Sequence, residues 1–161
     1  MVIRRIDEHT LAIEEIAPVV SELLRQISVH AQMDDPAVEQ RFLSPPTAGG
    51  EPEFEADWAE YVRPDLESSF AAALEVIRGD LQRLSGDTEE TLQLPIEHLE
   101  AWLLGLNQAR LGLAARHAFT DAELESDLPE GDEARAIALF HIRFYGLLME
   151  CFLGHLRELP D

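Results

Sequence analysis

The sequence predicts an all-α or nearly all-α protein, a helical bundle of four to six helices with a small N-terminal β-hairpin. Apolar residues recur at helical spacing through most of the chain, and prolines and glycines stand where such segments begin and end. A length of 161 residues with 46% apolar content is enough for one hydrophobic core. We therefore expect a single helical domain over residues 1–161, with surface loops near 44–52 and 119–132.

The amino-terminal segment contains two short runs rich in β-branched residues, 2–6 and 10–13, separated by the polar stretch 7–9. This pattern fits a hairpin, and a frayed first helical turn fits the same residues. From Pro18 the spacing becomes helical, with one apolar face formed by Val20, Leu23, Leu24, Ile27 and Ala31. A first helix is therefore predicted there.

Asp35 and Pro36 begin a predicted helix, which the proline- and glycine-rich stretch 44–50 soon ends.

Acidic and aromatic residues are interleaved between positions 51 and 67. Phe54, Trp58 and Tyr61 then share one helical face until Pro64, which should end or kink the helix at Arg63. Seven acidic residues surround these aromatic side chains. They fit a docking face for a basic amphipathic partner, or an amphipathic helix that lies on the protein's own core.

Two long helices, at about 95–117 and 133–156, are predicted to form the core. The first is apolar on most of its sides, as a buried central helix is. The second should direct seven side chains inward: Ile137, Phe140, Phe144, Leu148, Cys151, Phe152 and Leu156. Glycines at 105, 112, 146 and 154 indicate that backbones approach closely, so we expect these two helices to pack antiparallel. Residues 91–94 fit a short strand, and the acidic segment 120–133 fits a solvated connection.

The formal net charge of −20 is the strongest compositional signal. Such a field repels nucleic acid and anionic lipid, and no apolar run approaches the ~20 residues of a membrane span. We expect neither nucleic-acid nor membrane binding. The charge serves solubility, or it attracts a basic protein partner or divalent cations. With no secretory signal at the amino terminus, the expected location is the cytoplasm.

Arg110 is the most unusual polar residue, because helical spacing places it among apolar neighbours. A buried guanidinium needs a partner, and otherwise its charged end must reach solvent. Two interpretations follow: a clamp between helices, or an anion or carboxylate site shared with Asn107. His141 lies near the inward side of the last helix. It is either a hydrogen-bonded core residue or the third member of a polar pocket between the last two helices.

Neither metal nor cofactor binding is indicated by the sequence. A di-iron bundle needs Glu-x-x-His on two helices, and no histidine here follows a glutamate by three residues. Cys151 and His155 are one helical turn apart, but two residues at that spacing are more typical of core packing than of a metal site. We expect no metal ligands and no cofactor.

The segment from Trp102 to Leu113 resembles a known family. The pattern Trp-Leu, Leu-Asn and Arg-Leu-x-Leu stands here as Trp102-Leu103, Leu106-Asn107 and Arg110-Leu111-Gly112-Leu113. It is similar to the central helix of a bacterial family catalogued as a domain of unknown function, serial number two-zero-one-seven. The resemblance implies that Trp102, Asn107 and Arg110 are family features, and it implies no activity.

Two hypotheses about function follow. The chain lacks a phosphate loop, a dinucleotide fingerprint, a nucleophile elbow and a metalloprotease motif, which favours a non-catalytic adaptor or regulatory protein. Such a protein, which could form a homodimer, would use its acidic surface and Phe54, Trp58 and Tyr61 to meet a basic partner. The alternative is a small-ligand or metal-dependent enzyme with Asn107, Arg110 and His141 lining a pocket.

Overall fold

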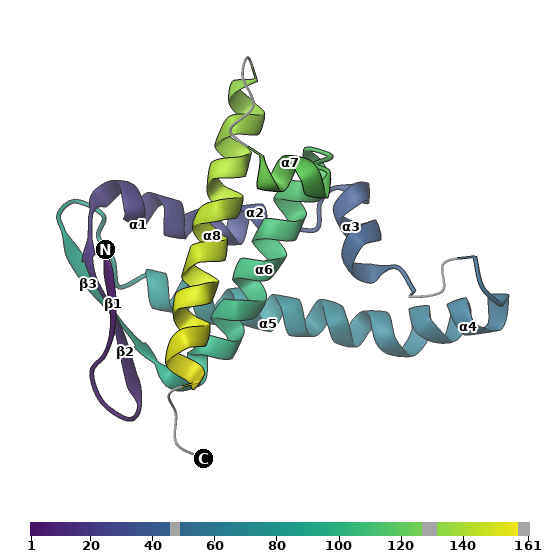
Figure 1. Cartoon of the computed structure of the whole chain (residues 1–161). Helices are drawn as coiled ribbons and strands as arrows, with labels where there is room; N and C mark the ends of the chain where they lie inside the picture. Colours follow the sequence, from purple (N-terminus) through teal and green to yellow (C-terminus); the bar gives the residue numbers. More distant parts are fainter. Residues whose placement is uncertain (46–48, 127–131, 158–161) are drawn as a thin grey trace.

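The structure is a computed structural model that describes residues 1–45, 49–126 and 132–157, and within them the chain is mostly helical with one small sheet (Figure 1). Strand β1 (Val2–Arg5) pairs antiparallel with β2 (Thr10–Ile16), which pairs antiparallel with β3 (Glu90–Pro95). The predicted hairpin is therefore confirmed, and the alternating segment 91–94 adds a third strand to it. The fold is mostly helical rather than purely all-α.

The helices begin largely where proline and capping residues predict them. Along the chain they are α1 (Pro18–Arg25), α2 (Ile27–His30), α3 (Pro36–Leu43), α4 (Pro52–Asp57), η1 (Trp58–Val62), α5 (Arg63–Leu81), η2 (Ile96–His98), α6 (Leu99–Arg116), α7 (Asp121–Glu125) and α8 (Glu133–Arg157). A proline opens α1, α3 and α4, where its missing N–H needs no partner. The Asp35 carboxylate caps α3 by accepting the backbone N–H of Ala37 at 2.8 Å.

Pro64 does not end the helix in which it lies. A π-helical turn, η1, precedes it, and α5 starts at Arg63 directly after that turn. Proline has no N–H for the carbonyl one turn earlier, and a wider turn accommodates this loss without breaking the helix. Residues 52–81 are thereby helical throughout, and the first part extends away from the rest of the protein (Figure 1).

α6 is the central helix, as its apolar residues predict. It packs against α8, α5, α2 and α3, and its buried side chains include Leu99, Trp102, Leu106, Ala109 and Leu113. The sheet closes one end of the same core with Leu11, Ile13, Ile16, Leu92 and Leu94. α6 and α8 run antiparallel, as expected (Figure 1).

The glycines of α6 mark close contacts, but with other helices than expected. A Cβ at Gly112 would lie 2.8 Å from the backbone oxygen of His30 in α2, and one at Gly105 would overlap Ile77 of α5. In α8, Gly146 lies beside the Arg110 side chain, and a Cβ at Gly154 would meet open space. The close approaches therefore join α6 to α2 and α5 rather than to α8.

The acidic segment 120–133, predicted to be a solvated connection, contains the short helix α7. α7 starts with a capping box in which the Thr120 and Glu123 side chains bond each other's backbone N–H groups. Residues 127–131 of the predicted loop, like 46–48 of the earlier one, lie outside the described residues.

The prediction for the inward face of α8 was partly wrong. Leu148 and Phe152 are buried, but Ile137 and Phe140 are 51% and 49% exposed. The buried face instead includes Leu139, Ile142 and Tyr145. Because α8 is apolar on two sides, its periodicity could not show which side meets the core.

α8 is also long and apolar enough to cross a membrane, judged by length and composition alone. Its most apolar window has a mean hydropathy of 1.5, and 33% of that window is buried inside the protein. Core helices of soluble proteins meet the same criteria, but they are mostly buried. The unburied share of α8 therefore needs its own explanation.

Candidate functional site

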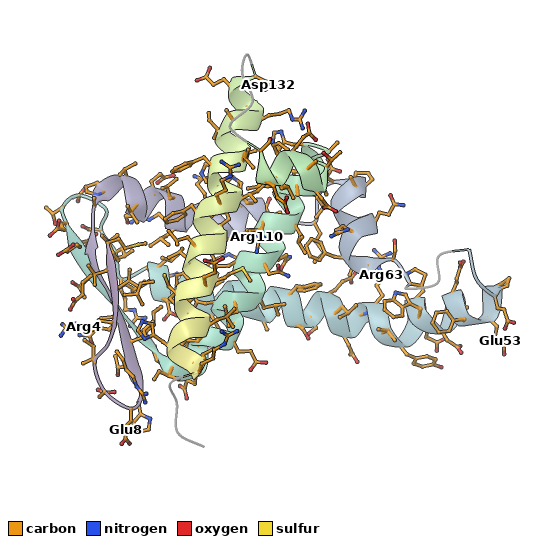
Figure 2. All side chains as sticks on the ribbon, viewed as in Figure 1. Arg4, Glu8, Glu53, Arg63, Arg110 and Asp132 are labelled. Atoms are coloured by element: carbon orange, nitrogen blue, oxygen red, sulfur yellow. The ribbon has the colours of Figure 1, made fainter. Side chains whose placement is uncertain are left out.

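Residues 51–67 form a projection that we call the acidic arm (Figure 2). No residue of α4 or η1 is buried, and Phe54 and Tyr61 are 43% and 63% exposed. The indole N–H of Trp58 donates to the backbone oxygen of Leu43 at 3.1 Å, which ties the arm to the end of α3. The predicted aromatic face is thus divided: Trp58 holds the arm, while Phe54 and Tyr61 lie open to solvent.

The charge of the arm is largely uncompensated. Arg63 is its one basic residue, and this guanidinium lies 2.8 Å from Glu67 and 3.8 Å from Glu39 of α3. Among the described residues, no other basic side chain forms an ion pair with an acid of the arm. The exposed aromatic side chains are therefore surrounded by negative potential, which attracts cations and basic peptides.

A cavity of about 320 Å³ lies where the arm joins the core. Its apolar wall includes Leu43, Phe70 and Leu74, and its polar lining includes Glu39 and Glu67. We call it the anchor cavity. It joins an apolar surface to two carboxylates, a combination that suits the long, amphipathic side chains of lysine and arginine.

Gln108 supplies an unused acceptor in the lining of the anchor cavity. The residue is 2% exposed, and its Nε2 donates to the backbone oxygen of Ala31 at 2.6 Å. Its Oε1 has no hydrogen-bond partner. A buried acceptor without a donor is unfavourable by about 1–3 kcal/mol. This oxygen is closed off from solvent, so a ligand in the cavity reaches it only if the Gln108 side chain moves. Gln108 was not predicted from the sequence, although a glutamine between Leu106 and Ala109 on a central helix is a usable signal.

Arg110 lies beside open space rather than in a clamp. It lines a cavity of about 650 Å³ between α6, α7 and α8, and a second of about 370 Å³ between α3, α6 and α7. Its Nη1 lies 3.6 Å from the sulfur of Met149, its buried Nε has no partner, and no described carboxylate is within ion-pair distance. Gly146 of α8 lies beside this side chain, and a Cβ there would be 3.7 Å from its Nε, an ordinary contact distance.

The other two residues of the predicted pocket lie elsewhere. Neither Asn107 nor His141 lines the two Arg110 cavities. The His141 imidazole bonds the backbone oxygen of Ile137 and lies edge-on to the ring of His30, 4.7 Å between centroids. The three side chains therefore do not line one cavity, and Arg143 lies beside Arg110 instead.

The comparison with protein families agrees with the resemblance in the central helix. The model of a domain of unknown function, DUF2017, matches residues 7–156, nearly the whole chain. The chain belongs to the DUF2017 family. No curated protein and no solved structure matches it.

In this DUF2017 protein, Trp102 of the resembling segment has a structural role. It is fully buried, and its indole N–H donates at 2.9 Å to Asp80 of α5. The same carboxylate accepts a hydrogen bond from Arg83 and bonds the His98 Nδ1 at 2.9 Å. We call these four residues the Asp80 network. Its hydrogen bonds join Asp80 of α5 to His98 and to Trp102 of α6, so we interpret the network as a link between α5 and α6.

A second buried polar cluster joins α2 to α8. The His30 Nδ1 lies 2.8 Å from the hydroxyl of Tyr145, and that hydroxyl lies 3.4 Å from the backbone oxygen of Leu23. Burial, with smaller contributions from His141, Arg116 and His117, lowers the pKa of His30 to about 4. Burial also raises the pKa of the Tyr145 hydroxyl above its usual range. The pair therefore stays neutral at neutral pH.

The low pKa of His30 predicts a loss of stability in acid. The unfolded ring binds a proton near pH 6.5 and the folded ring only near pH 4, so its contribution is complete above about pH 6.5 and declines as the pH falls toward 4. We expect urea unfolding to show that, between pH 6.5 and 4, the free energy of unfolding falls by about 1–2 kcal/mol less in His30→Gln than in the wild type. The partial exposure of His30 keeps this difference small. His9→Gln, at an exposed position, should keep the wild-type profile. Identical profiles for all three proteins would contradict the prediction.

The described residues contain no group of three or more histidine, cysteine, aspartate or glutamate side chains placed to hold a metal ion.

Proposed function

We propose that this DUF2017 protein is a non-catalytic protein-interaction domain whose acidic arm and anchor cavity bind a basic, amphipathic segment of another protein. Exposed Phe54 and Tyr61 would pack on the apolar side of such a segment, and the surrounding carboxylates would attract its basic side. Acidic surfaces with exposed aromatic residues are suited to this kind of partner.

The anchor cavity is the observation that carries the proposal. Glu39 and Glu67 line it together with an apolar wall, and the Gln108 side chain forms part of the lining. A lysine or arginine of the partner could place its aliphatic stem on Phe70 and Leu74. Its N–H groups would share the Glu39 and Glu67 carboxylates with Arg63, which pairs with both.

A synthetic helical peptide with leucine at core spacing and lysine elsewhere would test this function. Fluorescence anisotropy should detect binding at low salt that weakens as salt rises, because screening reduces the attraction. The double variant Phe54→Ser/Tyr61→Ser should bind at least about tenfold more weakly, since aromatic anchors dominate such interfaces.

Val19→Ser provides the matched control, because Val19 is 67% exposed on α1, outside the arm. It should bind the peptide as the wild type does. Binding that is insensitive to salt, or that persists in the arm double variant, would contradict the proposal.

A second candidate function is supported by the open position of Arg110. We propose that its guanidinium binds a small carboxylate or another small anion in the 650 Å³ cavity. A guanidinium that lacks a carboxylate partner can offer two parallel N–H groups to such a ligand. The acids Asp121, Glu125 and Glu150 also line this cavity, so the ligand must be small enough to stay near Arg110 and Arg143.

Thermal unfolding with succinate and with inorganic phosphate would test the Arg110 site. A ligand that binds only the folded protein raises the melting temperature. The wild type should be stabilised by one of these anions, and Arg110→Met, which keeps an apolar stem, should not. Arg78→Met, at an exposed position on α5, should respond as the wild type does. No shift with either anion, or an equal shift in Arg110→Met, would exclude the site.

A further inference from the structure

α8 carries a second apolar stripe on the side turned away from the core. Its members follow one another at spacings of three, four, three, four and three residues: Ile137, Phe140, Phe144, Leu147, Cys151 and Gly154. This alternation places all six on one side of the helix and is the spacing of a coiled-coil seam. We call it the outer stripe.

Much of the outer stripe is exposed in the single chain. Ile137, Phe140 and Leu147 are 51%, 49% and 55% exposed, and the ring of Phe140 stacks on that of Phe144, which is partly buried against the core. The opposite side of α8 fills the core with other residues. A helix with one side in the core is normally polar on the other, so a continuous apolar stripe there indicates an interaction surface.

We propose that the outer stripe is a homodimer interface in which α8 packs antiparallel against α8 of a second copy. Antiparallel pairing about the middle of the stripe places Ile137 opposite the partner's Gly154 and Phe140 opposite the partner's Cys151. At the centre, Phe144 lies opposite the partner's Leu147. In the two layers at each end, four in all, a large side chain thus meets a small one, which allows the helices to approach closely there.

Parallel pairing fits the same stripe poorly. It would place Phe140 against its own copy and Phe144 against its own copy, and it would leave a layer that contains only two glycines at position 154. Two crowded layers and one empty layer cannot be satisfied by helices at one separation. The order of side-chain sizes along the stripe therefore favours the antiparallel arrangement.

The charges beside the outer stripe agree with the antiparallel arrangement. Arg143 and Glu150 lie seven residues apart along the same edge of the stripe. Reversal of the second helix brings Arg143 near the partner's Glu150, and the two-fold symmetry repeats this contact. In the single chain, Nη2 of Arg143 donates to the backbone oxygens of Leu124 and Ser126 at the end of α7, so its guanidinium would turn from there to reach the partner's Glu150.

The size of the interface predicts how tightly the dimer holds. The stripe spans ~26 Å at 1.5 Å per residue. Two helices that touch over this length bury on the order of 1,000 Å² in total, near the lower limit for a specific interface. The charge of −20 on each chain opposes association, and salt screens that repulsion. We therefore expect a dimer that dissociates on dilution and that salt strengthens, the opposite of the salt response of arm docking.

Sedimentation equilibrium of the full chain tests the dimer. The wild type should shift from monomer to dimer as its concentration rises, and Leu147→Glu should stay monomeric with an unchanged circular dichroism spectrum. Val19→Glu adds the same charge on α1 and should dimerise as the wild type does. Glu150→Arg makes the net charge less negative, which by itself would favour association. It also places an arginine opposite the partner's Arg143, so we expect this repulsion to weaken the dimer. Glu100→Arg, an equal charge change on α6, should not weaken it.

Thiol cross-linking tests the direction of the helices. In the antiparallel register the two copies of Cys151 are eleven residues apart along the axis, ~16 Å, while position 140 shares a layer with the partner's Cys151. A short bis-maleimide should therefore link Phe140→Cys into dimers and leave the wild type unlinked. Cross-linking of the wild type would show a parallel pair and overturn the proposal.

Two further results would overturn the proposal. One is a wild type that stays monomeric at every concentration. The other is a monomer that sediments with phosphatidylcholine vesicles and loses this property in Leu147→Glu, which would assign the stripe to a lipid surface. These variants leave the acidic arm unchanged. A result that excludes the homodimer therefore does not affect the proposal that the arm binds a basic peptide, and a result that excludes peptide binding does not affect the homodimer.

Discussion

Trp102→Ala should lower the free energy of unfolding by about 3–5 kcal/mol, the range for truncation of a large aromatic residue in a packed core. Trp102 is fully buried between helices and the sheet, and its ring lies edge-on to Phe152 at 5.9 Å. The substitution removes these contacts and also takes one hydrogen-bond donor from the buried Asp80 carboxylate. Urea unfolding followed by circular dichroism would measure the change in midpoint.

Trp102→Phe separates the two contributions. It keeps an aromatic ring in the core but removes the indole N–H, so a loss of about 1–2 kcal/mol is expected. Trp58→Phe, on the arm, should change stability by less than either substitution, because Trp58 is only partly buried and lies outside the core. A Trp102→Ala protein as stable as the wild type would contradict the central role of this residue.

Asp80→Ala is expected to have the second largest effect, a loss of about 2–4 kcal/mol. Asp80 is 3% exposed and bonds three side chains from the end of α5 to the start of α6. Its removal leaves the Trp102 N–H buried without an acceptor, while Arg83 and His98 can still reach solvent. Asp80→Asn keeps an acceptor oxygen in place and should lose less, about 1 kcal/mol.

A double-mutant cycle between Asp80→Ala and Trp102→Phe measures their coupling directly. Residues that share a buried hydrogen bond are expected to be non-additive by about 0.5–3 kcal/mol. The exposed pair Glu75 and Arg78, also on α5, provides a comparison that should be close to additive. Additive losses at Asp80 and Trp102 would show that the hydrogen bond between them contributes little.

The elements of the fold were predictable because their signals are local. Pro18, Asp35 and Pro36 mark helix starts through backbone geometry and capping, and the apolar spacing of residues 99–113 identifies the central helix without knowledge of its neighbours. The hairpin and the segment 91–94 were visible for the same reason. α7 was missed because seven acidic residues dominate its segment, although Thr120 and Glu123 form a capping box.

The candidate sites were predictable only in part. Arg110 and the aromatic residues of the arm were found because each contrasts with its surroundings in the sequence. Gln108 and Asp80 were missed, although both interrupt an apolar stripe at helical spacing, Asp80 between Ile77 and Leu84. A polar residue in such a stripe can be satisfied, unsatisfied or turned to solvent, and only its neighbours in space decide which.

The sequence by itself determined the helical architecture, the family and the two acidic regions, because each depends on composition or on residues within a few turns. For the amino-terminal segment, the strand pairing in the structure decided between a hairpin and a helical turn. The tertiary structure alone decided which side of α8 enters the core, that Arg110 lies beside a cavity without a carboxylate, and that Gln108 keeps a free acceptor. These properties depend on the neighbours of each side chain in space, and those neighbours come from distant parts of the sequence. An apolar periodicity records that a helix face avoids water, and it does not record whether its own core or another molecule covers that face.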